Sequence, residues 1–134
     1  MRHTASRMTT ARILRSPQAL AAAGLVAPER IPALERVAAQ YAVAITPAMA
    51  ELIEAVDDPI ARQFVPTEAE MAVRPEESGD PIGDFAHSPV EGVVHRYPDR
   101  CLLKVNHACA VYCRFCFRRE MVGPEGLRRK QNRQ

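Results

Sequence analysis

Residues 101–119 read CLLKVNHACAVYCRFCFRR. Over residues 101–107 apolar side chains alternate with Lys104 and Asn106, a pattern that predicts a buried β-strand. The face of this strand that is expected to be buried comprises Cys101, Leu103, Val105 and His107. No other segment gives a comparable strand pattern, and a lone strand cannot satisfy its own backbone hydrogen bonds. The stretch therefore predicts the first strand of a sheet.

Three cysteines follow this strand with the spacing C-x3-C-x2-C, namely Cys109, Cys113 and Cys116. Three thiolates on one loop can converge on one metal centre and favour a four-iron cluster with one iron open to a further ligand. Zinc is the alternative, and a closed zinc site would need His107 or Cys101 as its fourth ligand. Cys101 lies up to ~26 Å from Cys109 along an extended chain. His107 is expected to face the sheet, so the cluster is the favoured occupant.

The composition of the 134 residues is typical of a soluble globular protein, with 47% hydrophobic and 25% charged residues. The longest apolar stretch, Ala19–Val26, is far shorter than the ~20 residues that a bilayer span needs. Four clustered cysteines are also unlike the disulfide framework of a small secreted protein. We therefore expect no membrane association and a cytoplasmic location.

Charge divides the chain into three parts. Residues 1–15 contain four arginines and no acid, which predicts a disordered basic arm, with a transit peptide as the alternative. Residues 16–99 contain five basic and fourteen acidic residues, whereas residues 100–134 contain nine basic and two acidic residues. A basic C-terminal segment can bind nucleic acid, but its arginines are not interleaved with a platform of aromatic residues. We therefore expect no nucleic-acid partner.

Residues 16–73 predict a layer of short helices, each with its own start signal. Most of these signals are a capping residue or a proline at the first turn, at Ser16-Pro17, Ile31-Pro32, Thr46-Pro47 and Asp58-Pro59, and Thr67–Glu70 fits a capping box. The apolar face of the third helix is expected to include Met49, Leu52, Ile53 and Val56. Residues 74–98 contain four prolines and three glycines and predict a long connecting loop without regular structure over most of its length.

The cysteine loop, with the aromatic Phe115 before its third cysteine, resembles the radical S-adenosylmethionine (SAM) signature. The sequence HRYPDR at residues 95–100 lies directly upstream, and together the two motifs resemble the lysine 2,3-aminomutase family. Shorter matches follow in the same order upstream, at Ala44–Pro47, Asp58-Pro59, Val65–Thr67 and Ser88–Val90. The resemblance covers roughly residues 17–123.

This resemblance implies an α/β fold, in which an N-terminal helical layer leads into the first strand and cluster loop of a truncated radical SAM partial (β/α) barrel. The radical SAM domain would begin at residues 99–126. The implied cofactors are a [4Fe-4S] cluster held by Cys109, Cys113 and Cys116, SAM and pyridoxal 5′-phosphate (PLP), with a reductant that supplies one electron. The implied reaction moves an amino group from C2 to C3 of an amino acid, with L-lysine favoured. Relatives also use glutamate or a lysine of elongation factor P, and full-length relatives are expected to be homo-oligomers.

Individual residues acquire roles from the same resemblance. Phe115 corresponds to the position beside the adenine of SAM, and Arg118 to the arginine that grips the substrate carboxylate. Arg96, Tyr97 and Arg100 correspond to groups around the PLP phosphate.

Two aromatic residues and one lysine have a different interpretation. Tyr112 and Phe117 are expected to be packing residues. The lysine that anchors PLP in the family lies much further along the chain, so Lys104 is not expected to take that role.

The chain departs from the family in length. Residues 127–134 form an atypical basic tail, and the chain is expected to be an N-terminal fragment that is inactive alone. The alternative is a self-contained iron–sulfur or zinc-binding module without aminomutase activity.

Overall fold

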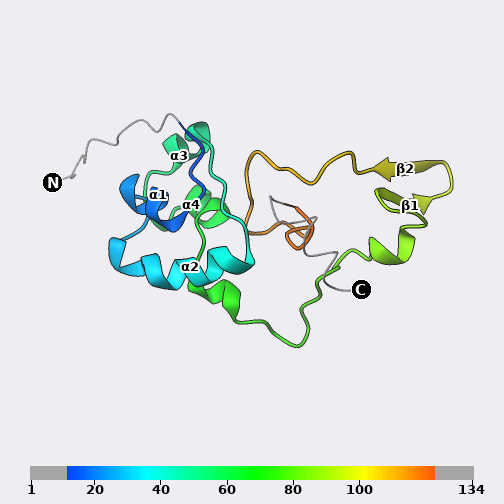
Figure 1. Cartoon of the computed structure of the whole chain (residues 1–134), viewed down its shortest axis with the longest axis horizontal. Coiled ribbons are helices and arrows are strands. Elements are labelled where there is room, and N and C mark those ends of the chain that lie inside the picture. Colours follow the sequence, from blue (N-terminus) through cyan, green and yellow to red (C-terminus); the bar gives the residue numbers. More distant parts are fainter. Residues whose placement is uncertain (1–11, 123–134) are drawn as a thin grey trace. The chain divides into compact units, whose positions relative to one another are not determined.

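The computed structural model describes residues 12–122 and divides the chain into two compact units (Figure 1). The helical unit comprises the described part of Met1–Val73 together with Ala110–Cys116. The hairpin unit comprises Arg74–Cys109 and the described part of Phe117–Gln134. The first eleven residues of the predicted basic arm and the predicted tail of residues 127–134 lie outside the described residues.

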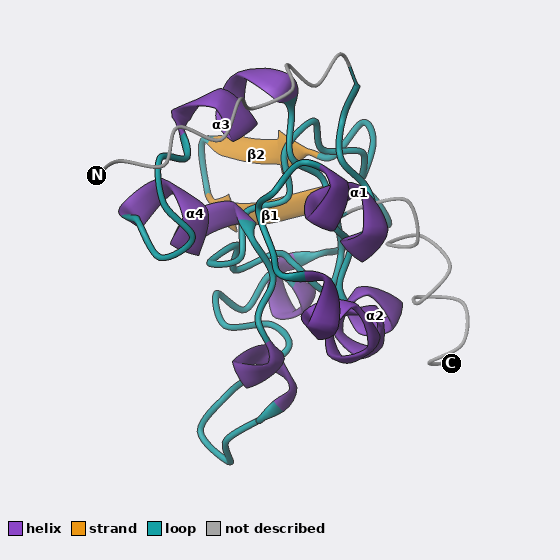
Figure 2. Cartoon of the chain, turned by 90° about the vertical axis from the view of Figure 1, so that its left-hand side faces the viewer, coloured by secondary structure: helices purple, strands orange, loops and turns teal. Residues whose placement is uncertain are grey.

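Short helices dominate the helical unit (Figure 2). They are α1 (Pro17–Ala22), α2 (Ile31–Gln40), α3 (Pro47–Leu52) and α4 (Pro59–Phe64), with 3-10 helices η1 (Pro28–Arg30) and η2 (Glu68–Met71). The predicted start signals are confirmed: the side chains of Ser16, Thr46 and Asp58 each accept a hydrogen bond from a backbone N–H in the first turn of their helix. Each of these caps satisfies a donor that the helix itself leaves unpaired.

The capping box predicted for the fifth helix is present, but it begins the 3-10 helix η2. The Glu70 carboxylate accepts a hydrogen bond from the Thr67 N–H at 2.9 Å. Pro75 disfavours a helical conformation at the residue before it, so a longer helix could not continue past this point. Glu70 is thereby fixed at the end of the predicted helical region.

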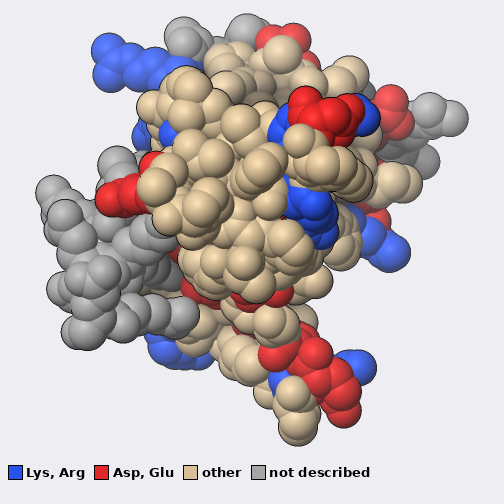
Figure 3. Space-filling model, turned by 90° about the vertical axis from the view of Figure 1, so that its right-hand side faces the viewer, with Lys and Arg blue, Asp and Glu red and all other residues tan. Residues whose placement is uncertain are grey.

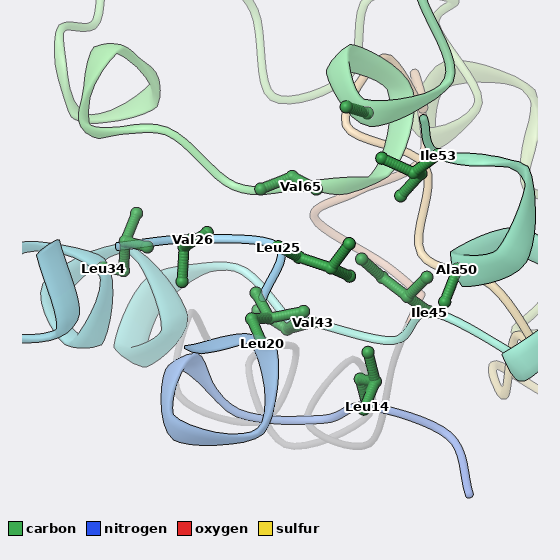
Figure 4. Close-up of a cluster of buried hydrophobic side chains, with 11 residues drawn as sticks. Leu14, Leu20, Leu25, Val26, Leu34, Val43, Ile45, Ala50, Ile53 and Val65 are labelled. Carbon is green, nitrogen blue, oxygen red and sulfur yellow. The ribbon is translucent and has the colours of Figure 1, made fainter. Parts of the chain in front are cut away.

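The core of the helical unit consists of aliphatic side chains from the four α-helices and from the segments that flank them (Figure 4). Its buried members are Leu14, Leu20, Leu25, Val26, Leu34, Val43, Ile45, Ala50, Ile53, Ala61 and Val65. Gly24, at φ 71°, occupies the left-handed conformation that ends α1.

Two expectations about this unit are wrong. Leu14 belongs to the predicted disordered arm, yet it is buried and exchanges two backbone hydrogen bonds with Ile45 at 2.9 and 3.0 Å. Leu52 and Val56 were expected on the apolar face of α3, but both side chains are exposed. Since α3 ends at Leu52, Val56 lies beyond the helix, whereas Ile53 is buried and Met49 packs against the core.

The hairpin unit contains an antiparallel pair, β1 (Val93–Tyr97) and β2 (Arg100–Leu103). Val93 is opposite Leu103, and Tyr97 is opposite Arg100. The predicted buried strand over residues 101–107 is therefore wrong in extent and burial, because β2 ends at Leu103 and is exposed throughout.

Residues 74–98 lack regular structure over most of their length, as predicted, but a 3-10 helix forms at Phe85–His87 and β1 lies at their C-terminal end. The prolines and glycines flank β1 rather than interrupt it. Pro98 falls in the turn between the strands, where its missing N–H removes no ladder hydrogen bond. The described residues thus hold a small open two-stranded sheet.

Acidic and basic side chains both reach the surface, as the face drawn in Figure 3 shows. Over residues 12–122, none of the helices has the length and apolar character needed to cross a lipid bilayer.

Candidate functional site

The cysteine loop is attached to the helical unit through its backbone. The Tyr112 N–H donates to the Ala44 carbonyl oxygen at 2.9 Å, and the Arg114 N–H donates to the Gln63 carbonyl oxygen at 2.7 Å. The Tyr112 side chain is buried, which confirms its predicted packing role. The two residues that flank Cys113 in the sequence are therefore both hydrogen-bonded through their backbone to the helical unit.

The guanidinium of Arg114 makes a buried, two-point ion pair with Glu70. Its Nε lies 3.1 Å from Oε1 and its Nη2 lies 2.6 Å from Oε2, while Nη1 donates to the Ala42 carbonyl oxygen at 2.7 Å. The side chains of Arg114 and Glu70 are only 4% and 12% exposed. The guanidinium carbon also lies 5.3 Å from the centroid of the Tyr112 ring. A planar fork that matches a carboxylate in this way is specific to arginine.

Of the predicted ligands, Cys113 lies between the buried Tyr112 and Arg114, and Cys116 follows Arg114. Cys113 and Cys116 are partly exposed, and the Cys116 N–H donates to the Cys113 carbonyl oxygen at 3.2 Å in a tight turn. Phe115 is 74% exposed. Burial thus alternates along the loop, with Tyr112 and Arg114 inward and the predicted functional residues outward.

The donor set has the chemistry that an iron–sulfur centre requires. Cys109, Cys113 and Cys116 are all free thiols, as is Cys101, and Cys109 is exposed within the hairpin unit. Within the described part of the chain, no three His, Cys, Asp or Glu side chains are grouped closely enough to hold a metal ion. The residues therefore fit a cluster by type and spacing, and metal binding would be coupled to ordering of the loop.

A second cluster of charge forms around Asp84 in the hairpin unit. Its side chain is 2% exposed, and its Oδ2 accepts from Arg118 Nε at 2.8 Å. Arg96 Nη2 lies 3.7 Å from Asp84 Oδ1 and donates to the Ile82 carbonyl oxygen. Two arginines that the resemblance assigned to different ligands thus share one buried carboxylate.

The other residues expected near PLP lie at the hairpin turn. Arg100 pairs with Asp99 through Nε and Nη2, at 3.1 and 2.9 Å, and its guanidinium carbon lies 5.6 Å from the Tyr97 ring centroid. Both Arg100 and Tyr97 are well exposed. The three residues predicted to surround the PLP phosphate therefore do not form one group. Arg96 pairs with Asp84, whereas Arg100 and Tyr97 contact each other.

Two minor expectations have different outcomes. Phe117 is 51% exposed and contacts the Arg118 guanidinium at 5.1 Å, so its predicted packing role is wrong. His107 was expected to face the sheet, but it lies beyond the end of β2 at Leu103. Its Nδ1 donates to the Met121 carbonyl oxygen at 2.9 Å, which gives this histidine a structural partner.

Comparison with known proteins finds several relatives of this chain. Over 83 residues the chain is 42% identical to L-lysine 2,3-aminomutase of Clostridium subterminale, a match that covers 60% of this chain and 20% of that protein. Over 98 residues it is 39% identical to the L-lysine 2,3-aminomutase of Acetoanaerobium sticklandii, covering 72% of this chain and 24% of that protein. This chain is homologous to part of the lysine 2,3-aminomutases. No protein-family model matches it.

One similar protein is named for an amino acid other than lysine. Glutamate 2,3-aminomutase of Clostridioides difficile is 36% identical over 94 residues, which is 69% of this chain and 22% of that protein. The chain therefore spans about a fifth to a quarter of the length of the lysine 2,3-aminomutases and other curated relatives that it matches.

Sequence reasoning missed Arg114, Glu70 and Asp84. Arg114 looked like one more basic residue of the C-terminal segment, and Glu70 like a capping residue alone. Their pairing joins positions 44 residues apart, which no local pattern reveals. The sequence feature that comes closest to indicating this pairing is that an aromatic residue, Tyr112, and an arginine, Arg114, flank Cys113.

Acidification is expected to weaken the hairpin unit through Asp84. The hydrogen bond from Arg118 holds the pKa of Asp84 below its ordinary value of 3.8, although burial acts in the opposite direction. Since the folded pKa is lowered, the stabilisation is present above pH 3.8 and is lost as the pH falls through the folded value. In urea unfolding, the difference between the wild type and Asp84→Asn should shrink on acidification. A difference that does not change between about pH 7 and pH 3 would contradict this role.

Proposed function

We propose that this chain supplies the cluster-binding part of a radical SAM aminomutase, an isomerase that moves an amino group from C2 to C3 of an amino acid. The carrying observation is the loop of three free thiols with C-x3-C-x2-C spacing, in a chain homologous to 2,3-aminomutases. L-lysine is the proposed substrate, because most of the similar proteins are named for it, and glutamate is the alternative.

The proposed ligands of a [4Fe-4S] cluster are Cys109, Cys113 and Cys116. When bound, the cluster, SAM and PLP together supply the radical chemistry, which leaves the protein to bind, orient and exclude water. Phe115, with 74% of its surface exposed, offers a ring face on which the adenine of SAM can stack. An external reductant would deliver the single electron.

Arg118 is the proposed partner of the substrate carboxylate. Asp84 takes its Nε, and the side chain keeps 29% of its surface exposed, so the Nη edge is the one that a carboxylate would approach. The buried carboxylate thereby fixes the orientation of the fork in advance. Arg96, Tyr97 and Arg100 are the proposed partners of the PLP phosphate, and the exposure of Arg100 and Tyr97 makes them accessible.

The electron paramagnetic resonance (EPR) spectrum of the reduced, reconstituted chain tests this proposal. Three thiolates leave one iron of the cluster without a protein ligand, so SAM should bind that iron and change the spectrum. The same spectrum with and without SAM would contradict the radical SAM assignment. That outcome would favour the alternative, a self-contained iron–sulfur module.

The chain as it stands is expected to form no β-lysine when given SAM, PLP, L-lysine and a reductant. Its lysines are Lys104 and Lys130, and neither corresponds to the lysine that anchors PLP in the family. A chromatographic assay for β-lysine checks this expectation. Clear product formation would show that the 134 residues are a complete enzyme.

A further inference from the structure

We propose that Arg114 and Glu70 are positioning residues, whose buried ion pair holds Cys113 and Cys116 in a fixed, partly exposed arrangement ready to bind metal. The inference deepens the proposed function, since it relies on these cysteines being cluster ligands. It adds a role for two side chains that neither the sequence motifs nor the similarity assigned.

Each nitrogen of the Arg114 guanidinium has a hydrogen-bond acceptor. Arg114 uses Nε and Nη2 for Glu70 and Nη1 for the Ala42 carbonyl oxygen. Oε1 of Glu70 also accepts from the Thr67 N–H at 2.9 Å. One guanidinium thus joins the cysteine loop to the segment after α2 and to the start of η2. Lysine, with a single ammonium nitrogen, cannot reproduce these three directions.

The position of Arg114 in the loop is fixed by its backbone as well. Arg114 lies next to Cys113 and two residues before Cys116, and its backbone N–H is itself held by the Gln63 carbonyl oxygen at 2.7 Å. On the other side of Cys113, Tyr112 is anchored to Ala44 and buried. With both neighbours buried and hydrogen-bonded, Cys113 is held in its partly exposed position.

A second ion pair on the same 3-10 helix is much more exposed. Arg30 pairs with Glu68 of η2, but these side chains are 33% and 42% exposed. An exposed pair of this kind contributes little to stability. Both pairs involve a glutamate of η2, but only the buried pair includes a residue of the cysteine loop. Comparing the two pairs therefore separates an effect on the loop from an effect on the attachment of η2.

Thiol labelling of the full, metal-free chain tests the inference without any cluster. Site-resolved mass spectrometry after iodoacetamide treatment gives a rate for each cysteine. In the wild type, Cys113 and Cys116 should react more slowly than the exposed Cys101 and Cys109. Arg114→Gln should accelerate labelling of Cys113 at least about fivefold and leave Cys101 and Cys109 unchanged. Loss of a nearby positive charge would by itself slow labelling, so acceleration reports increased exposure.

Two controls separate positioning from general stability. Arg30→Gln makes the same substitution opposite the same 3-10 helix and should leave all four rates unchanged. Leu34→Ala weakens the core, and its labelling should follow only the unfolded fraction seen by circular dichroism. Glu70→Gln removes the charge but keeps an oxygen for the Thr67 N–H, so it tests the pair if Arg114→Gln does not fold. Arg114→Lys should restore the wild-type rate only in part.

Iron retention in the reconstituted chain is the second readout. Outer groups that orient metal ligands typically change affinity by about tenfold or more, so Arg114→Gln and Glu70→Gln should lose iron to a chelator about tenfold faster than Arg30→Gln. Wild-type labelling and retention in both variants would overturn the inference. If the wild type binds no cluster while labelling changes as expected, the proposed function fails and the positioning of the loop stands.

Discussion

Alanine at Cys109, Cys113 or Cys116 should abolish the iron–sulfur cluster, whereas Cys101→Ala should retain it. Each of the three supplies one of three protein thiolates, and a cluster that already has one open iron cannot lose another ligand and stay bound. Cys101 is an exposed residue of β2, eight positions before the first ligand of the motif. The effect is measured after anaerobic reconstitution. Visible absorption in the thiolate-to-iron charge-transfer bands reports the cluster, and iron analysis gives its amount.

Cys101→Ala is the matched control for these variants, because it removes a free thiol from the same chain by the same substitution. Loss of the cluster in this variant would refute the assignment of ligands. Retention of a full cluster in any of the other three would do the same.

Leu34→Ala should destabilise the helical unit by about 2–5 kcal/mol. Leu34 lies on α2 and is completely buried, in the core cluster that α1 and η2 also help to cover. Its truncation removes transfer free energy and leaves a cavity, which is large against a total stability of about 5–15 kcal/mol for an ordinary domain. Urea unfolding followed by circular dichroism gives the difference.

Leu52→Ala is the control in the same unit. Leu52 is 54% exposed at the end of α3, so its truncation should change the free energy of unfolding by no more than about 0.5 kcal/mol. Equal effects of the two substitutions would contradict the packing described for the core.

Helix starts were predictable because their causes are local. Thr46 and Asp58 each precede a proline, and both the cap and the proline act within one turn of the helix. The lengths were less predictable, since tertiary packing decides where a short helix ends. The burial of Leu14 depends on pairing with Ile45, which lies 31 positions away and leaves no local trace.

The hairpin shows the opposite case, in which local signals misled. Prolines and glycines between residues 74 and 98 argued against regular structure, but they surround β1 and leave Val93–Tyr97 uninterrupted. The alternating pattern after Cys101 predicted burial, yet Val105 lies beyond β2 and is 81% exposed. Alternation identifies a strand conformation, and only the fold decides whether either face is covered.

For the candidate site, spacing in the sequence was sufficient to predict the three cysteines as ligands, and that remains a prediction. It could not predict what orients them. The partners of Arg114 and Arg118 lie 44 and 34 positions away, and pairing over such distances depends on the fold. Buried carboxylates at Glu70 and Asp84 are the feature that the structure adds.

Metal and sulfide analysis of the reconstituted wild-type chain tests the central claim most directly. A cluster held by Cys109, Cys113 and Cys116 requires about four iron and four labile sulfide ions per chain. Protein purified without oxygen should contain no stoichiometric zinc. One zinc ion per chain, with no labile sulfide after reconstitution, would contradict the account.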